Sequence, residues 1–548
     1  MNRAFNSAVI VAIALALVSP LRAQDVQSTP TLKSSTELVL VPTVVNDKSG
    51  AHIANLKKEE FVLKQDGKPQ SVAVFEEVKT DSARARRSEG EHGTFSNIEP
   101  GSSDFHRLNI IVLDFVNTPF ADRANARKEL LKFLSSVAEA GEPMCLLALT
   151  QGGLTMIHSF TDDPKLLAAA LRQSPVNTSP LIHEPQTAPG EFGSERGFLE
   201  RIIRANLEGE ARMSSLVGKE AVSVTVQALQ QIAKAFRGLP GRKSLIWASS
   251  GFPFPVTPFS QSGCEPNCPA RDSYDNLWRM MNDAQIAIYS VDLRAATVGT
   301  AQDPGGVRPS DIGDPQFDTD AQARQNMEDS SDTLRLFAEN TGGKAFLGGS
   351  DLIQAFHQAT QDASSYYMLG YYVSRNSKPG WHAISLAITM KGAHLRYRNG
   401  FLLSQDTTSS SARPDVQLAL ASPFDFVGVP VSVTWSGREP GKSAGTTRLQ
   451  FDLVMPANFT SVDESDQNHM VLDIAAVARN PKGEVVTELY QHIDRHLNSD
   501  GLAQIRHNGM TYRSHLQLPP GEYNVRFVVR DSLVNRIGSV AAPLKVSP

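Results

Sequence analysis

Almost wholly apolar runs recur through the middle of the chain, separated by amphipathic segments. Strands that are buried on both faces have this composition. In the segment that follows the first run, leucines recur at helical spacing, as on the inner face of a covering helix. The alternation predicts an α/β fold with a doubly wound, mostly parallel sheet. Its expected central strands are Leu108 to Phe115, Met144 to Thr150, Ser244 to Ala248 and Ile286 to Val291, and the first helix is Asp122 to Glu139.

Strand-like patterns flank this region. Residues 36–80 alternate like strands around a hairpin signal at Asp66-Gly67, which predicts a small β unit. Residues 81–104 have almost no apolar content and are expected to be a linker. The α/β domain, with insertions and a β-rich tail, is assigned to 105–403, and a Ser/Thr-rich hinge to 404–414. Residues 415–548 show short strands at regular intervals, which predicts an Ig-like β-sandwich.

The first 23 residues have the pattern of a secretory signal peptide. Arg3 precedes an apolar run of about eleven residues, and a small residue, Ala23, marks the expected cleavage site. The run is shorter than the roughly twenty residues that cross a bilayer, so an uncleaved anchor is the lesser alternative. We expect a secreted or periplasmic protein with no transmembrane segment after cleavage.

Charge and cysteine content narrow the function classes. With 53 Lys and Arg against 58 Asp and Glu, the net charge is −5, which argues against a nucleic-acid partner. An exported protein can hold disulfides, and Cys264 and Cys268 are close enough in sequence for a local bridge. Zinc binding there would need two further ligands, which the neighbouring sequence lacks. Cys145 lies in an apolar run and is expected to be a buried thiol.

Asp114 ends the first central strand, at the edge where an open α/β sheet forms its ligand crevice. The segment resembles the first loop of a von Willebrand factor A domain, and the chain as a whole is similar to the VWFA-related family described from acidobacteria. The resemblance covers about Thr36 to Phe401. The motifs that carry it are Leu239-Pro-Gly-Arg-Lys-Ser-Leu-Ile246, Ala287-Ile-Tyr-Ser-Val-Asp292, Leu336-Phe-Ala-Glu-Asn-Thr-Gly-Gly343 and Asp362-Ala-Ser-Ser-Tyr-Tyr-Met-Leu-Gly-Tyr371.

The resemblance implies a von Willebrand A/Rossmann-like sheet and a metal-ion-dependent adhesion site, which this sequence has in degenerate form. Asp114 matches the first metal ligand, but Val116 replaces the first serine of the motif and Thr118 the second. Ser249-Ser250-Gly251 stands where such domains often have Thr-Asp-Gly, so a second carboxylate is missing. Asp114 and Thr118, helped by neighbouring polar groups, are candidate ligands for weak Mg²⁺ or Ca²⁺ binding. The alternative is that Asp114 only hydrogen-bonds loop amides.

Three other groups of residues contain side chains that occur in catalytic or binding motifs. Ser249 and Ser250 lack the flanking small residues of a nucleophile elbow. Gly238 to Ser244 does not have the spacing of a phosphate loop and is expected to be a basic turn. His492 and His496 are spaced like helix neighbours but lie in a β-rich region, which argues against a metal site.

Paired tyrosines at 366–367 and 371–372 are an aromatic cluster suited either to packing or to binding sugar or peptide. Packing between a strand and a helix is the favoured interpretation of this cluster.

Taken together, the sequence predicts an exported, non-enzymatic protein with a protein-binding, adhesion or scaffold role. The alternatives are a secreted hydrolase that uses Asp114 and carbohydrate binding by the C-terminal sandwich. A protein ligand at the cell envelope or outside the cell is the expected partner. It is expected to meet the edge of the sheet at Asp114, Asn117, Thr118, Ser249, Ser250 and Gly251.

Overall fold

A computed structural model gives the fold. It describes residues 36–79, 93–97, 108–118, 120–136, 143–174, 220–237, 239, 241–251, 269–293, 331–347, 352–374, 377–403, 412–443 and 445–547. The predicted signal peptide, most of the predicted hinge, and Cys264 and Cys268 lie outside the described residues. The signal peptide and the disulfide therefore stay predictions.

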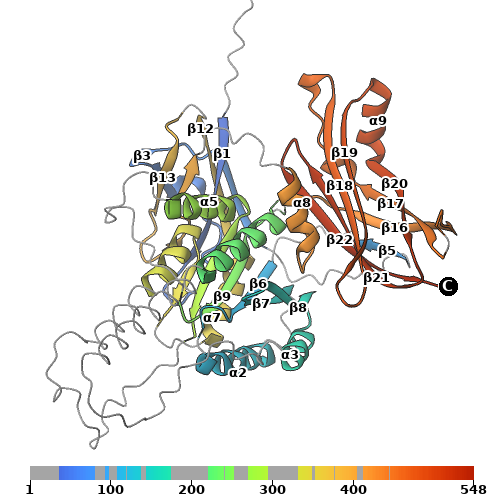
Figure 1. Ribbon diagram of the computed structural model, residues 1–548. Coiled ribbons are helices and arrows are strands. Elements are labelled where there is room, and N and C mark those ends of the chain that lie inside the picture. Colours follow the sequence, from blue (N-terminus) through green and yellow to red (C-terminus); the bar gives the residue numbers. More distant parts are fainter. Residues whose placement is uncertain are drawn as a thin grey trace, which may run out of the picture.

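A six-stranded mixed sheet forms the centre of the molecule (Figure 1). Its strand order is β11-β10-β9-β6-β7-β8, and all neighbours are parallel except β7 and β8. Every residue of β6, β9 and β10 is buried, as the continuous apolar runs predict. The strands are β6 (Leu108–Asp114), β7 (Met144–Thr150), β8 (Gly153–Thr161), β9 (Lys243–Ser249), β10 (Ile286–Asp292) and β11 (Lys344–Phe346).

Helices pack on both faces of this sheet. On one face, Ile111 of β6 shares a core with α2 (Phe120–Ser136), α3 (Pro164–Gln173) and α7 (Leu352–Ser364). On the other face, the core includes a helix over 220–236, α5 (Pro269–Asp283) and a helix over 331–341. The start of α3 is fixed by its sequence, because the Asp163 carboxylate accepts the Lys165 amide and Pro164 occupies the first turn.

The N-terminal strands do not form a unit of their own, so the separate β unit predicted over 36–80 is wrong. These strands pair instead with the predicted β-rich tail, about 300 residues away in the chain, in two four-stranded sheets, β14-β1-β12-β4 and β15-β13-β2-β3. The pairing buries apolar partners such as Val41 with Leu369 and Leu63 with Leu386. Asp66 and Gly67 both have positive φ, 49° and 78°, and form the predicted turn between β2 and β3.

The strands of these two sheets are β1 (Thr36–Asn46), β2 (Phe61–Gln65), β3 (Lys68–Pro69), β4 (Val74–Lys79), β12 (Ser365–Ser374), β13 (Gly380–Ile388), β14 (His394–Arg396) and β15 (Gly400–Leu403).

The C-terminal part contains two four-stranded antiparallel sheets around a shared core. One has the order β20-β17-β16-β5, and the other β19-β18-β21-β22. The strand β5 (Thr94–Ser96) belongs to the predicted linker but pairs with β16, so that stretch is not only a linker. In Figure 1 this blue strand lies among the red C-terminal strands. The others are β16 (Ser432–Pro440), β17 (Thr447–Met455), β18 (His469–Arg479), β19 (Val485–His496), β20 (Met510–Leu518), β21 (Gly521–Asp531) and β22 (Arg536–Val546).

Two α-helices accompany the strands of the C-terminal part, which the sequence predicts to be all β. The first, α8 (Ala412–Ala421), takes up the last residues of the predicted hinge, and the second, α9 (Ser499–Asn508), lies between β19 and β20. The C-terminal part packs on the helix over 220–236, where Phe236 stacks on Phe424 with ring centroids 5.8 Å apart and Lys234 pairs with Asp415 at 2.5 Å. In Figure 1, α8 lies between the C-terminal sheets and the central region.

As a description of the whole chain, the predicted fold class is wrong. Within the described residues, parallel pairing occurs only in the mixed sheet, and the other four sheets are antiparallel. The protein is therefore mostly β, without a dominant doubly wound parallel sheet. The error arose because the buried runs are easily detected, whereas pairing between distant strands leaves little trace in local sequence.

None of the helices that the structure describes has the length and apolarity to span a bilayer.

Candidate functional site

Asp114 lies at the carboxyl end of β6 and holds two loops together. Its Oδ1 accepts the backbone N–H groups of Val116 and Asn117 at 3.0 and 2.9 Å. Its Oδ2 accepts the Asn117 amide at 2.7 Å and the Trp247 indole N–H at 3.2 Å, and lies 2.9 Å from the Ser249 hydroxyl. One carboxylate thus joins the loop after β6 to the end of β9.

A second set of contacts ties the same loops. The Thr118 hydroxyl accepts the backbone N–H of Ser250 at 3.1 Å, and the Ser250 hydroxyl lies 3.3 Å from Oδ2 of Asp122 at the start of α2. The Gly251 backbone N–H donates to the Ser249 hydroxyl at 3.2 Å. The structure therefore brings all six predicted site residues together at one edge of the mixed sheet.

Burial changes the role that these residues can have. Asp114 and Ser249 are fully buried, Thr118 and Ser250 are 2% and 7% exposed, and Gly251 is buried too. Of the six, only Asn117 is partly exposed. The expectation that a partner contacts all six residues directly is therefore wrong, because five of them are buried. These five fix the shape of the two loops.

The Asp114 carboxylate does not fit a tight Mg²⁺ or Ca²⁺ site. A carboxylate offers about four lone-pair positions, and here four N–H donors and a hydroxyl already surround it. The Thr118 hydroxyl oxygen already accepts the backbone N–H of Ser250. A cation would have to displace protein donors at a fully buried group. The structure thus favours the alternative in which Asp114 hydrogen-bonds the loop amides.

The carboxyl group of Asp114 lies in a desolvated place. Burial raises the pKa of this carboxyl, and the hydrogen bonds from Asn117, Ser249 and Trp247 oppose that shift. Arg123 of α2 lies close by and donates to the backbone carbonyls of Thr118 and Phe115, at 2.8 and 2.5 Å. These contacts extend the fixed region from the carboxylate to the first turns of α2.

Sequence reasoning missed several members of this network. Trp247 donates its indole N–H, Thr225 receives the Asn117 amide at 2.9 Å, and Arg123 anchors the loop carbonyls. Thr225 lies 108 positions from Asn117 in the chain. No local spacing rule connects two residues so far apart.

The arrangement also bears on nucleophilic catalysis. A serine nucleophile needs a base within hydrogen-bond reach. Among the described residues, no histidine hydrogen-bonds to Ser249 or Ser250, whose hydroxyls face Asp114, Asp122 and the Gly251 carbonyl. The Asp114 carboxylate is itself occupied by donors. In the described part of this edge, the serine hydroxyls thus help to hold the loops in place, and Asp122 is the carboxylate that faces Ser250.

The cations of the predicted basic turn before β9 are buried. Arg242 is 2% exposed and its guanidinium donates to the Gly342 carbonyl and to the Tyr289 hydroxyl. Lys243 is fully buried, with Nζ 2.8 Å from the Leu239 carbonyl and 2.9 Å from that of Gly241. Desolvation lowers the pKa of Lys243 to about 7.

Three of the four tyrosines in the predicted cluster, and Cys145, behave as the sequence predicts. Tyr366, Tyr367 and Tyr371 are buried, and the Tyr366 hydroxyl accepts the Arg242 backbone N–H at 3.0 Å, which confirms packing as their role. Tyr372 differs, because its side chain is 59% exposed. Cys145 is buried in β7, and burial raises the pKa of its thiol. The three buried tyrosines and the Cys145 thiol are therefore not accessible to a ligand.

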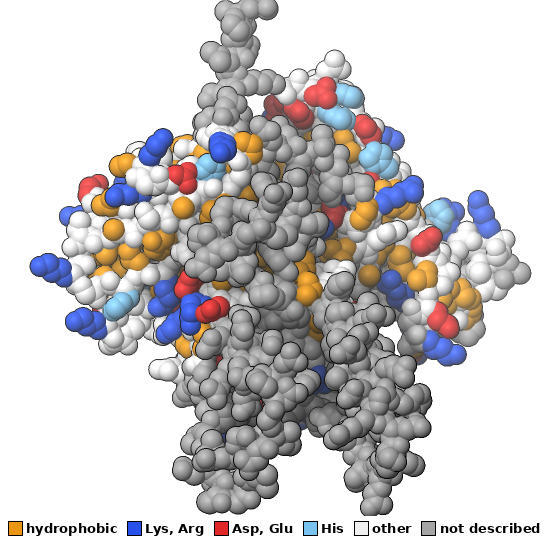
Figure 2. Space-filling model, turned by 60° about the vertical axis from the view of Figure 1, so that its left-hand side comes forward, with side chains coloured by type: hydrophobic (Ala, Val, Ile, Leu, Met, Phe, Trp, Pro, Cys, Tyr) orange, Lys and Arg blue, Asp and Glu red, His pale blue; other side chains and the backbone are white. Residues whose placement is uncertain are grey.

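The described surface offers no concentrated charge on the side that Figure 2 shows. Lys and Arg side chains appear there at several separate places, interspersed with acidic, histidine and uncharged side chains. Binding to a polyanion needs several cations gathered on one face. Among the side chains that are coloured in Figure 2, cations and acids occur on the same elements of the surface.

No protein-family model matches this chain, and no curated protein matches it. Among solved structures, the crystal structure of the pilus adhesin SpaC from Lactobacillus rhamnosus GG is similar over 80% of this chain, at 9% identity and a TM-score of 0.22. The match covers 54% of the adhesin chain, so this chain spans about half of its length. A likeness at this TM-score does not establish a shared fold.

Proposed function

We propose that this is an exported, non-enzymatic protein that recognises another protein through the loop edge of its mixed sheet. We define the loop edge as residues 115–118 and 249–251, of which Val116 and Asn117 are partly exposed and would meet the partner, while the buried residues hold them in place. The observation that carries the proposal is the Asp114 carboxylate, which spends its accepting capacity on joining these two loops. A loop surface fixed in advance loses little conformational freedom on binding, which favours affinity.

The use of Asp114 separates recognition from catalysis. A hydrolytic site needs a carboxylate or nucleophile that is free to exchange a proton with substrate. Here the carboxylate is fully buried and surrounded by protein donors, and the nearby serines are bonded within the loops. These contacts support a recognition surface over a hydrolase.

Two sequence features support the same proposal. The leader pattern over residues 1–23 supports export to the periplasm or the outside of the cell. The motifs that resemble the VWFA-related family agree with a protein-binding role. In that comparison this chain keeps the position of the aspartate but uses it to hold the loops, so metal-mediated contact is not part of the proposal.

The test uses a substitution that loosens the loop edge. Thr118→Val removes the acceptor of the Ser250 N–H, and leaving a buried amide unsatisfied costs about 1–3 kcal/mol. Thr94→Val is the matched control, since it removes the Thr94–Thr434 hydroxyl contact in the distant C-terminal sheet. We expect affinity capture from envelope extract to yield a protein that wild type and Thr94→Val retain and Thr118→Val loses.

Two results would contradict the proposal. In the first, folded Thr118→Val captures the same protein in the same amount as the control. In the second, the purified protein turns over ester, peptide or glycoside substrates and Ser249→Ala abolishes that turnover. The second result would establish the hydrolase alternative.

A further inference from the structure

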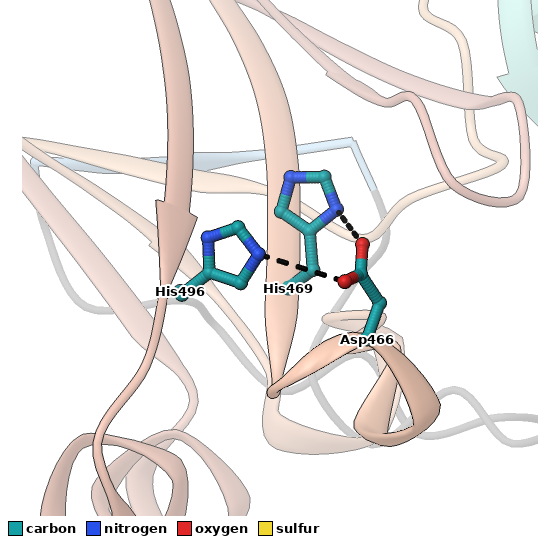
Figure 3. A group of neighbouring side chains, drawn as sticks. All are labelled: Asp466, His469 and His496. Carbon is teal, nitrogen blue, oxygen red and sulfur yellow. Dashed lines mark ion pairs between the residues drawn. The ribbon is translucent and has the colours of Figure 1, made fainter.

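Two histidines and an aspartate from three separate segments meet beside the open end of the β18–β19 hairpin. His469 begins β18, His496 ends β19, and Asp466 lies in the short 3-10 helix η5 (Glu464–Asp466). Figure 3 shows both imidazoles beside the aspartate, with an ion pair drawn from each to its carboxylate. The three side chains are 21%, 49% and 59% exposed for His469, His496 and Asp466, so solutes can reach them.

The strand pairing fixes the two imidazoles side by side. His469 and His496 are direct partners across the antiparallel pair. The backbone N–H and carbonyl of His469 both bond to Asp463, so the two histidines form the non-hydrogen-bonded kind of pair, in which side chains approach more closely. Their rings stack with centroids 4.6 Å apart and 9° between planes.

The facing atoms have the spacing of metal ligands. Nδ1 of His469 lies 3.2 Å from Oδ2 of Asp466, and Nε2 of His496 lies 3.7 Å from Oδ1. One ligand atom from each of the three residues lies within 4.8 Å of the others. Bonds of about 2.0–2.2 Å place the ligand atoms of a tetrahedral zinc roughly 3.3 Å apart. Closing the three around one ion requires the two imidazoles to rotate out of their stacked arrangement, so that a nitrogen of each points at the same position.

A fourth residue supports this arrangement from outside. Oδ1 of Asp494 lies 2.7 Å from Nε2 of His469, the ring nitrogen opposite to the one that faces Asp466. A carboxylate on the far nitrogen of a metal-bound histidine orients the ring and leaves the near nitrogen to bind the metal. Asp494 occupies that place, since it lies two residues before His496 on β19.

We propose that Asp466, His469 and His496 bind one divalent transition-metal ion, zinc in the first place, with Asp494 as a positioning residue. Imidazole nitrogen and carboxylate oxygen suit zinc. Three protein ligands leave one tetrahedral position for water or for a group from another molecule. The ion would join the η5 turn to the ends of two strands, at a place remote from the loop edge.

The test is calorimetric titration of the full chain, without a histidine tag, with zinc chloride. We expect one site per chain, and at least a tenfold loss of affinity in His469→Ala and Asp466→Asn. Asp494→Asn is expected to weaken binding by roughly 10- to 100-fold while the site still binds one ion. His492→Ala is the matched control, because His492 lies on the same strand but faces Asp473, at 2.8 Å; its affinity should equal that of wild type.

A second readout guards against a folding defect. Zinc should raise the Tm of wild type and of His492→Ala, but leave the Tm of His469→Ala unchanged, and the metal-free Tm values show that each variant is folded. The proposal is overturned if wild type takes up no zinc, or if folded His469→Ala and Asp466→Asn bind it as tightly as His492→Ala. Failure here leaves the proposed recognition function intact, because the two sites share no residue.

Discussion

Lys243 provides a pH-dependent test of the buried structure before β9. Its ammonium group has two carbonyl partners, those of Leu239 and Gly241, and is fully buried. Desolvation lowers its pKa from an ordinary value of 10.5 to about 7. Between these two values the folded protein holds a neutral amine, whereas the unfolded chain binds a proton.

The sign and size of the effect follow from this difference in proton binding. Because the unfolded state binds more protons, the free energy of unfolding rises with pH between about 7 and 10.5 and is flat below that window. The limiting slope is about 1.4 kcal/mol per pH unit. Between pH 7 and pH 9, where the folded group titrates over the first part, Lys243 should contribute a rise of about 2 kcal/mol.

Lys243→Met isolates this contribution. Methionine is unbranched, so it fills the channel of the lysine stem but cannot titrate. Urea unfolding of both proteins is followed by tryptophan fluorescence at pH 7, 8 and 9. Any cost of the two carbonyls left without the amine is the same at each pH, so only the change with pH is compared.

We expect the free energy of unfolding of wild type, relative to that of Lys243→Met, to rise by about 2 kcal/mol from pH 7 to pH 9. Lys132→Met is the control, since Lys132 lies on the surface of α2 with a side chain that is 50% exposed, and its curve should run parallel to that of wild type. The reasoning is refuted if Lys243→Met also runs parallel to wild type, because the buried amine would then not change its protonation on folding.

Three further predictions concern packing, the loop edge and the cysteines. Gly343→Ala should prevent folding to the native state, because a Cβ there would lie 1.9 Å from a carbonyl oxygen of β10. Gly152→Ala is the control and should leave the Tm close to that of wild type, since the atom nearest to its Cβ would be 3.7 Å away. Equal Tm values for the two variants would contradict this prediction. Asp114→Ala should lower the free energy of unfolding by about 3–5 kcal/mol, measured by urea denaturation, since buried donors lose their acceptor; a loss below 1 kcal/mol would contradict the network. Alkylation of the unreduced protein in urea should add one group, at Cys145, by mass spectrometry, and three adducts would contradict the predicted disulfide.

The strands of the mixed sheet were predictable because burial on both faces leaves a continuous apolar run. Predicted runs at 108–115, 144–150 and 286–291 match β6, β7 and β10 within one residue at each end. The partners of the N-terminal strands were not predictable in this way. Val41 and Leu369 become neighbours only through pairing across the chain, and the sequence of either strand does not indicate its partner.

The position of the candidate site was predictable from the sequence, but the hydrogen bonds that its residues make were not. An aspartate after a buried strand marks the carboxyl edge of a sheet, and Ser249 after β9 marks the same edge. That Asp114 would be saturated by donors depends on Trp247 and Ser249, which reach it from a different strand. The histidine–aspartate group was missed for a similar reason, since His469 and His496 are 27 positions apart and become neighbours through strand register.

The most direct test of the account is hydrogen–deuterium exchange of the chain with and without its captured partner. The account predicts that the partner slows exchange in peptides that contain 115–118 and 249–251, the two loops that Asp114 joins. Slowed exchange confined to the C-terminal sheets, with the loop edge unchanged, would contradict it and place recognition elsewhere in the molecule.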